Sequence, residues 1–319
     1  MHRTLSFGLR NIQEFPMLAT HVPYHLPVSI FGKLALSVLL SVSFAEGQTQ
    51  ASCTFTFFRT LFSFPNAQLF PSGINDFGTV VGGAFTTSNT GFIRWANAGL
   101  AFSSGTSALT SRNDNGVSLG YDSHGNGIIL SGKSVSSAAV TIGANTYDGV
   151  GVSFVGINDW GSVVGLYGDS AGVAHGFKRW TNGKGFLLNY PAHFTSVNSG
   201  TFPTAINDSG VIVGFTQIPY HAFVYHNGKW AAIQYPKAIA TWLSGISNAG
   251  VIAGNAQLAD GSTIGFLYDN GVFKIISPPN TTGPGVGSGV TGISLRSGLV
   301  LGFADLPNSP RQGYIAQCN

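Results

Sequence analysis

A ten-residue pattern recurs along the chain after residue 70, and it limits the possible folds more than any other feature. In its clear copies an Ile is followed by Asn or Ser and then by Asp or Asn. A Gly stands two residues after this pair, and a β-branched run and a closing Gly follow. They occupy residues 73–82, 156–165, 205–214 and 245–254, and degenerate copies begin at Arg112 and Gly292, the latter with one inserted residue. Successive copies lie 38 to 49 residues apart. Strand-built repeats of this length are typical of β-propellers and β-solenoids.

Each repeat is consistent with four short strands. The Asn-Asp-x-Gly step predicts a tight turn, because Asn and Asp favour turn starts and Gly readily adopts a positive φ. The β-branched run that follows, such as Val211–Val213, suits a buried strand. A third strand carries Gly-Phe or Ala-Phe, and an Asn-Gly pair such as 227–228 predicts a second hairpin before the fourth strand. Four antiparallel strands joined by short hairpins form one propeller blade.

The two ends of the repeat region complement each other. The sixth repeat stops after its third strand, at residues 313–319, while an unassigned strand, Cys53–Phe58, precedes the first repeat. We therefore predict an all-β, six-bladed β-propeller of four-stranded antiparallel blades, the last blade closed by the N-terminal strand. Closing the ring removes exposed strand edges. An open β-solenoid is the alternative.

The chain has only two cysteines, and this register places them together. Cys318 ends the third strand of the sixth blade, and Cys53 begins the strand assigned as its fourth. We predict a Cys53–Cys318 disulfide in place of the hairpin that joins these strands in other blades. The alternative is two unrelated cysteines at frayed ends.

An apolar segment near the N-terminus indicates export. Lys33 precedes the 12 residues Leu34–Ala45, a length that suits a signal peptide and is short of the roughly 20 residues of a membrane span. The expected organisation is a signal peptide with an N-terminal extension at 1–45, a linker at 46–52 and one propeller at 53–319. A buried core helix is the alternative for the segment, and the long extension also fits a mis-set translation start. The expected location is extracellular, by secretion, or periplasmic.

The repeats resemble the HAF repeat of bacterial proteins, a probable extracellular repeat named for a His-Ala-Phe triplet. The triplet stands here as His221-Ala222-Phe223 and, in degenerate form, as His175-Gly176-Phe177. The resemblance covers about residues 70–319. It implies an exported bacterial β-repeat protein, and it supplies no activity or ligand to transfer.

Composition excludes several classes of protein. Charged residues make up 8% of the chain and the net charge is only +3, which argues against nucleic-acid binding. The hydrophobic fraction of 44% argues against intrinsic disorder. The only two Glu, Glu14 and Glu46, argue against a helical bundle. We expect a monomer with no membrane span in the mature chain.

No motif carries catalytic chemistry, and the chain is more consistent with a non-enzyme. The repeated acids Asp76, Asp114, Asp159 and Asp208 share one turn position, and we expect them to lie far apart around the ring. His221 and His226 should point to opposite faces of one strand, which disfavours a zinc pair. We expect no cofactor. Calcium is the one alternative, at loops 168–172 and 259–262, although each loop has a single carboxylate.

Aromatic residues in the longer inter-strand segments indicate ligand binding. These segments should share one face of the ring, and stacking of aromatic rings suits sugars or apolar peptides. The candidate ligand-binding residues are Tyr147, Phe154, His193, Phe194, Phe202 and Trp242. The alternative is that these rings only fill space between blades.

Three function classes follow from these observations. The first is a binding module for a glycan or protein ligand, and the second is a structural repeat protein without a specific ligand. The third is a carbohydrate-active hydrolase or lyase. The third requires at least two acids to gather near the axis from the set Asp148, Asp169, Asp260 and Asp305.

Overall fold

The computed structural model describes residues 48–58, 68–85, 89–97, 99–103, 105–148, 151–191, 200–217, 220–281, 287–305 and 311–319. The chain divides into two compact units, Met1–Ser37 and Val38–Asn319, and every described residue belongs to the second. The predicted signal peptide therefore lies outside the described residues. Within these ranges the secondary structure is strands and turns, and no described helix has the length and apolarity to cross a bilayer.

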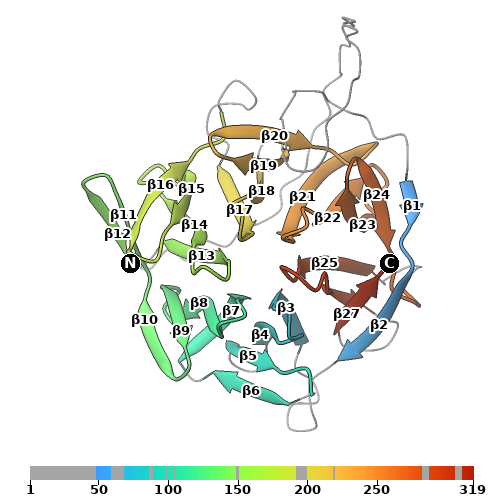
Figure 1. The fold of residues 1–319 in the computed structure, drawn as a ribbon, viewed down its shortest axis with the longest axis horizontal. Helices are drawn as coiled ribbons and strands as arrows, with labels where there is room; N and C mark the ends of the chain where they lie inside the picture. Colours follow the sequence, from blue (N-terminus) through green and yellow to red (C-terminus); the bar gives the residue numbers. More distant parts are fainter. Residues whose placement is uncertain are drawn as a thin grey trace, which may run out of the picture. The chain divides into compact units, whose positions relative to one another are not determined.

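Six sheets surround a central axis in the second unit, as the repeats predict (Figure 1). From the axis outward, blade one contains β3 (Gln68–Ile74), β4 (Val80–Phe85), β5 (Asn89–Arg94) and β6 (Leu100–Ser103). Blade two contains β7 (Thr106–Arg112), β8 (Val117–Asp122), β9 (Gly127–Ser131) and β10 (Ser134–Ser137). Blade three contains β13 (Val152–Ile157), β14 (Val163–Gly168), β15 (Ala174–Arg179) and β16 (Lys184–Leu188).

The remaining blades follow the same plan. Blade four contains β17 (Thr201–Ile206), β18 (Ile212–Thr216), β19 (Ala222–His226) and β20 (Lys229–Ile233). Blade five contains β21 (Ala238–Ile246), β22 (Ile252–Leu258), β23 (Thr263–Asp269) and β24 (Val272–Ile276). Blade six contains β25 (Gly287–Ile293), β26 (Val300–Asp305), β27 (Gln312–Cys318) and, from the other end of the described chain, β2 (Cys53–Phe58).

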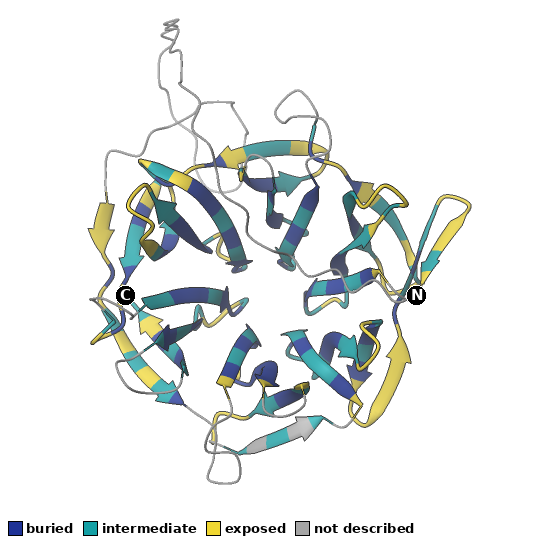
Figure 2. Cartoon of the chain, turned by 180° about the vertical axis from the view of Figure 1, so that it is seen from behind, coloured by how far each residue is buried: buried dark blue, intermediate teal, exposed yellow. Residues whose placement is uncertain are grey.

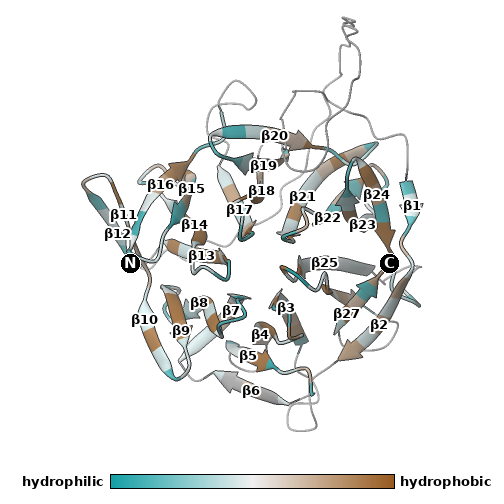
Figure 3. Cartoon of the chain, in the orientation of Figure 1, coloured by the Kyte–Doolittle hydropathy of each residue, from teal (hydrophilic) through white to brown (hydrophobic). Residues whose placement is uncertain are grey.

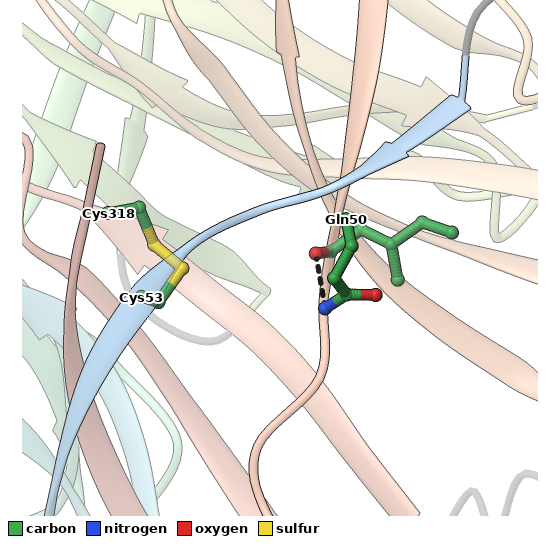
Figure 4. The surroundings of a disulfide bond; sticks show 4 residues. Gln50, Cys53 and Cys318 are labelled. Carbon is green, nitrogen blue, oxygen red and sulfur yellow. Dashed lines mark hydrogen bonds between the residues drawn. A yellow bond between two sulfur atoms is a disulfide. The ribbon is translucent and has the colours of Figure 1, made fainter.

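The predicted closure of the ring is confirmed. Strand β2 pairs antiparallel with β27 over its full length, and Cys53 stands opposite Cys318 in the register. The two cysteines form a disulfide with their Cα atoms 4.1 Å apart (Figure 4). Because the sixth sheet contains strands from both ends, the architecture is a closed propeller and the open solenoid is excluded.

Two segments outside the four-strand plan form additional strands. The region between β10 and blade three contains the hairpin β11 (Ala139–Ile142) and β12 (Asn145–Asp148). Strand β11 pairs parallel with β16, and β1 (Gln48–Gln50), in the expected linker, pairs parallel with β24. Both additions satisfy backbone groups at the outer edge of a blade, which an edge strand otherwise exposes.

Burial is greatest in the inner and middle strands of each blade. Figure 2 shows the outermost strands β10 and β20 with more exposed positions than β4 or β14, and Figure 3 shows apolar residues on inner and outer strands alike, including β16 and β24. The β-branched residues Val163 and Val164 and the third-strand Phe177 are buried. A Cβ at Gly165 would lie 2.6 Å from the Phe177 Cζ, so this glycine leaves room for the Phe177 ring to pack across the blade.

The turn between the first and second strands has the predicted geometry. Gly161 and Gly210 have φ angles of 75° and 78°. The Asn158 carbonyl accepts from the Gly161 N–H at 3.0 Å, and its side-chain Oδ1 accepts from the Ser162 N–H at 2.8 Å. One Asn therefore fixes both sides of the turn, which explains why Asn starts it.

Candidate binding site along the propeller axis

Each innermost strand contains a β-bulge at the same repeat position, three residues before the turn's Asn or Ser. The strand pairing skips one residue there in every blade. The six bulged residues are Ser72, Thr110, Val155, Thr204, Ser244 and Thr291. Because a bulge turns a side chain away from the regular alternation, it can re-aim that side chain toward a site. Five of the six positions carry a hydroxyl group.

Three of these hydroxyl groups link neighbouring blades. The Thr110 hydroxyl donates to the Phe154 carbonyl at 2.8 Å. In the same way Thr204 donates to the Leu243 carbonyl and Ser244 to the Val290 carbonyl, each at 2.8 Å. A hydroxyl has one proton and two lone pairs, so these groups keep only the capacity to accept.

The six bulged residues line one cavity of about 410 Å³. This volume falls within the roughly 300–1,000 Å³ typical of small-molecule sites. Three aromatic side chains, Phe215, Trp242 and Phe303, line it from the consecutive blades four, five and six. The described residues around this cavity include no charged side chain.

Contacts outside the cavity hold its aromatic rings in place. Phe215 stacks on Phe202 with ring centroids 5.2 Å apart and planes 6° from parallel. The Arg311 guanidinium lies 4.1 Å from the Phe303 ring centroid and forms two hydrogen bonds with Asp305, at 2.7 and 2.8 Å. The Arg311 charge is therefore compensated beside the cavity.

The space along the axis narrows beyond the bulges, where the next residue in four of the six strands is glycine. A cavity of only about 50 Å³ lies there. A Cβ at Gly245 would lie 2.8 Å from the Ile293 nitrogen, and one at Gly156 would lie 2.9 Å from the Ala205 Cα. Adjacent innermost strands thus approach too closely for a larger side chain, and this contact forms the floor of the larger cavity.

The expectation that the repeated acids lie far apart is wrong. The innermost strands run in the same direction, so their terminal turns converge at the other end of the axis, where the ring is narrowest. The backbone N–H of each acid donates to the side chain of the next blade: Asp76 to Asp114, Asp114 to Asp159, Asp159 to Asp208 and Asp208 to Asn248, at 2.9 to 3.0 Å. We call Asp76, Asp114, Asp159, Asp208, Asn248 and Arg296 the carboxylate ring.

Arg296 lies in the turn of the sixth repeat, which contains one inserted residue, and it supplies the cation of the carboxylate ring. Its guanidinium lies 2.9 Å from Asp159, 3.6 Å from Asp208 and 3.8 Å from Asp114. Its backbone N–H donates to Asp76 Oδ1 at 2.7 Å, which closes the circle of hydrogen bonds. Oxygens of Asp76, Asp114 and Asp159 lie within 4.8 Å of one another, a spacing compatible with a metal ion.

The carboxylates of the ring differ in acidity. Burial, together with the charges of Asp76 and Asp159, raises the pKa of Asp114 to about 6. Burial opposes the ionisation of Asp76 as well, but N–H groups of Ser297 and Arg296 hold the pKa of Asp76 below its ordinary value. One carboxyl of the ring therefore takes up a proton near neutral pH while its neighbour resists protonation.

The predicted ligand-binding residues have different environments. Trp242 lines the cavity, and Phe202 supports it through Phe215. Phe154 is fully buried and packs on Phe177, so its ring fills space between strands. Tyr147 packs against Tyr167, with the two ring centroids 4.3 Å apart and the planes tilted by 31°, and it does not line the cavity. His193 and Phe194 lie outside the described residues.

The acids proposed for catalysis or calcium binding have local partners. Asp169 contacts His175 at 2.9 Å and accepts from two N–H groups of its own turn, and Asp260 accepts from Ser262. Asp305 pairs with Arg311, while Asp148 is exposed on β12. The acids that gather at the axis are the repeated turn acids instead.

Sequence analysis missed the bulged hydroxyls, Phe215, Phe303 and Arg296. A signal for the hydroxyls is present, because Ser or Thr recurs three residues before the turn in five of six repeats. The inserted residue of the sixth repeat likewise marks Arg296. Neither signal indicates by itself that these side chains meet at the axis.

Comparison with known proteins identifies no relative by sequence. No family model and no curated protein matches the chain. Among solved structures it is similar to the β-propeller domain of the Trilobed protease from Pyrococcus furiosus, at 8% identity and a TM-score of 0.47, covering 79% of this chain and 97% of that one. TolB from Acinetobacter baumannii is similar at 10% identity and a TM-score of 0.49, covering 76% and 65%. The Aleuria aurantia lectin in complex with α-methyl-L-fucoside is similar at 11% identity and a TM-score of 0.42, covering 78% and 94%. The propeller assignment rests on the strand pairing of the chain itself.

Proposed function

We propose that this chain is an exported binding propeller that takes a glycan ligand into the axial cavity. The observation that carries the proposal is the cavity of about 410 Å³ in which five bulged hydroxyl groups face three aromatic rings. Sugars combine apolar C–H faces with hydroxyl groups, so they suit a site that offers both aromatic stacking and hydrogen bonds. Trp242, a candidate ligand-binding residue from the sequence, lines this cavity, and its position supports a stacking role.

Export is supported by two features at the N-terminal side of the propeller. The apolar segment Leu34–Ala45 has the length of a signal-peptide core. The Cys53–Cys318 disulfide is typical of an oxidising compartment. The resemblance to HAF repeats implies the same location, and membership of that repeat family is part of this proposal.

A glycan array probed with the purified full chain, followed by calorimetry on the strongest ligand, tests the proposal. Trp242→Ala should weaken binding about tenfold or more, because the variant removes a stacking ring from the cavity. Trp160→Ala is the matched control, because Trp160 is 71% exposed in the turn at the carboxylate end. A structural repeat protein would bind no glycan at all, and equal loss in both variants would place the site elsewhere.

A further inference from the structure

We infer that the axial cavity selects uncharged sugars and recognises them as hydrogen-bond donors. This inference rests on the proposed function and specifies its ligand class. It follows from how the hydroxyl protons of the bulged residues are used, from the charges around the cavity, and from the one bulge that lacks a hydroxyl.

The polar groups of the cavity wall offer lone pairs to a ligand. The Thr110, Thr204 and Ser244 hydroxyls donate their protons to carbonyls of the next blade at 2.8 Å. The Ser72 and Thr291 hydroxyls likewise point to carbonyls, of Phe70 and Leu301, at 3.3 and 3.4 Å. A ligand that supplies O–H groups satisfies these oxygens, whereas a ligand that supplies only acceptors does not.

The one amide in the wall is already engaged. Asn255 donates to the Val290 carbonyl at 2.8 Å and to the Ser244 hydroxyl at 3.1 Å, and its Oδ1 accepts from the Val290 N–H at 2.8 Å. It therefore adds no free donor to the wall. Among the described lining residues, the Thr263 hydroxyl and the Trp242 indole N–H remain as donors, fewer than the five bulged hydroxyls that present lone pairs.

Charge balance at the cavity disfavours ionised sugars of either sign. A uronic acid would bring a carboxylate against lone pairs with no cation to pair it. The nearby Arg311 guanidinium already donates to both carboxylate oxygens of Asp305. An amino sugar would bring an ammonium group to a wall in which the described residues include no carboxylate. Burying an unpaired charge costs far more than one hydrogen bond returns.

Val155 breaks the hydroxyl ring in blade three and provides an internal test. It occupies the same bulge as Thr110 and Thr204 but presents methyl groups to the cavity. The ring of acceptors is therefore incomplete on one side, and the number of acceptors can be raised or lowered by one with isosteric substitutions.

The experiment measures binding of the full chain to the methyl glycosides of glucose, galactose and mannose. Each is paired with its uronic acid, its 2-amino analogue and its mono-O-methyl ethers, which keep the oxygen and lose the donor. The best-bound neutral glycoside should bind at least about tenfold more tightly at pH 7 than its charged counterparts and than at least one of its methyl ethers. Equal binding of a charged analogue, or of every ether, would overturn the inference while leaving glycan binding intact.

Two variants sharpen this result. Thr204→Val removes one acceptor, so the affinity for the parent glycoside relative to that for its methyl ether should fall about fivefold. Val155→Thr adds one acceptor and should raise the same ratio. Unchanged ratios in both folded variants would contradict the inference. If Thr204→Val fails to fold, Val155→Thr and the ligand series still decide it. Absence of binding by any glycoside, charged or neutral, would instead refute the proposed function.

Discussion

The two ends of the propeller axis are built by the same six repeats, from the bulged residue at one end and the turn residue four positions later at the other. The two ends nevertheless use their polar groups in opposite ways. At the cavity end, uncharged hydroxyls donate to neighbouring blades and keep free lone pairs that face a space of about 410 Å³. At the other end, the acids of the carboxylate ring accept from one another's N–H groups and surround a guanidinium. One end retains hydrogen-bonding capacity for a ligand, and the other directs it into linking the blades.

The local backbone explains this difference. A bulge swings one side chain per blade toward the axis without ending the strand, so space remains between blades. A turn ends the strand at the narrowest part of the ring, so backbone N–H groups and carboxylates of adjacent blades come within hydrogen-bonding distance. We therefore expect the cavity end to govern binding and the carboxylate ring to govern stability and its pH dependence.

The largest expected effect removes the closure on which both ends depend. The disulfide joins residues separated by 265 positions, and its loss in Cys53→Ser/Cys318→Ser should lower the free energy of unfolding by about 2–5 kcal/mol. Denaturant unfolding measures this, and wild type treated with a reductant is the control. The variant should lose sugar binding at the same lowered denaturant concentration at which it unfolds, because opening the ring disrupts both the cavity and the carboxylate ring. Unchanged unfolding would mean that the β2–β27 pairing alone closes the ring.

The next effect separates the two ends. Arg296→Gln leaves the mostly buried carboxyls of Asp114, Asp159 and Asp208 without their cation. It should lower the free energy of unfolding by about 1–3 kcal/mol at pH 7. This loss is smaller than for a fully buried ion pair because the Arg296 side chain is 61% exposed. The cost should shrink as pH falls below about 6, because Asp114, whose pKa is raised to about 6 by burial and neighbouring charges, then takes up a proton and no longer needs a cationic partner. Sugar affinity at the cavity end should not change.

Arg296→Lys is the matched control, because it keeps the charge and the backbone while losing the planar guanidinium. It should lose less stability than Arg296→Gln. Equal losses in the two variants would show that packing, rather than charge, holds the turn. A loss of sugar affinity in a folded Arg296→Gln variant would show that the two ends are coupled.

The fold could be predicted from sequence because its determinants are local and repeated. The Asn-Asp-x-Gly turns and β-branched runs define the strands, and the strand that ends at Cys318 lacks the partner that begins at Cys53. A ring built from such repeats satisfies both ends at once, and the disulfide follows from that register.

The site could be predicted only in part, because it depends on distances across the ring. Trp242 and Phe154 are both aromatic residues on innermost strands, but Trp242 lies two residues before its bulge and faces the cavity, whereas Phe154 lies one residue before its bulge and points between strands. Asp114 and Asp159 are 45 residues apart in sequence and hydrogen-bonded in space, because the turns converge at a small radius. Arg296 could not be placed without knowing that radius.

The smallest expected effect tests the acidity of the carboxylate ring. The folded protein holds the proton of Asp114 up to a pKa of about 6, whereas the unfolded chain releases it near the ordinary value of 3.8. Between these values the folded state binds more protons, so the contribution of Asp114 to the free energy of unfolding falls as pH rises. Asp114→Asn keeps the oxygen that accepts from Asp76, as Asn248 does in blade five, and removes the charge. The variant should be more stable than wild type at pH 7, by up to about 1 kcal/mol for a partly screened charge, and nearly equal at pH 4.

Asp76→Asn should behave in the opposite way and is the control. Because N–H groups of Ser297 and Arg296 lower the pKa of Asp76, its ionised form stabilises the folded state above pH 4, and this contribution is lost as pH falls through the folded value. Asp76→Asn should therefore be less stable than wild type at pH 7, and the difference should diminish in acid. Thermal unfolding of both variants from pH 3.5 to 7.5 measures the two slopes. If both variants shift stability in the same direction at pH 7, the carboxylate ring behaves as one diffuse charge, and the distinction between a strained Asp114 and a well-held Asp76 is wrong.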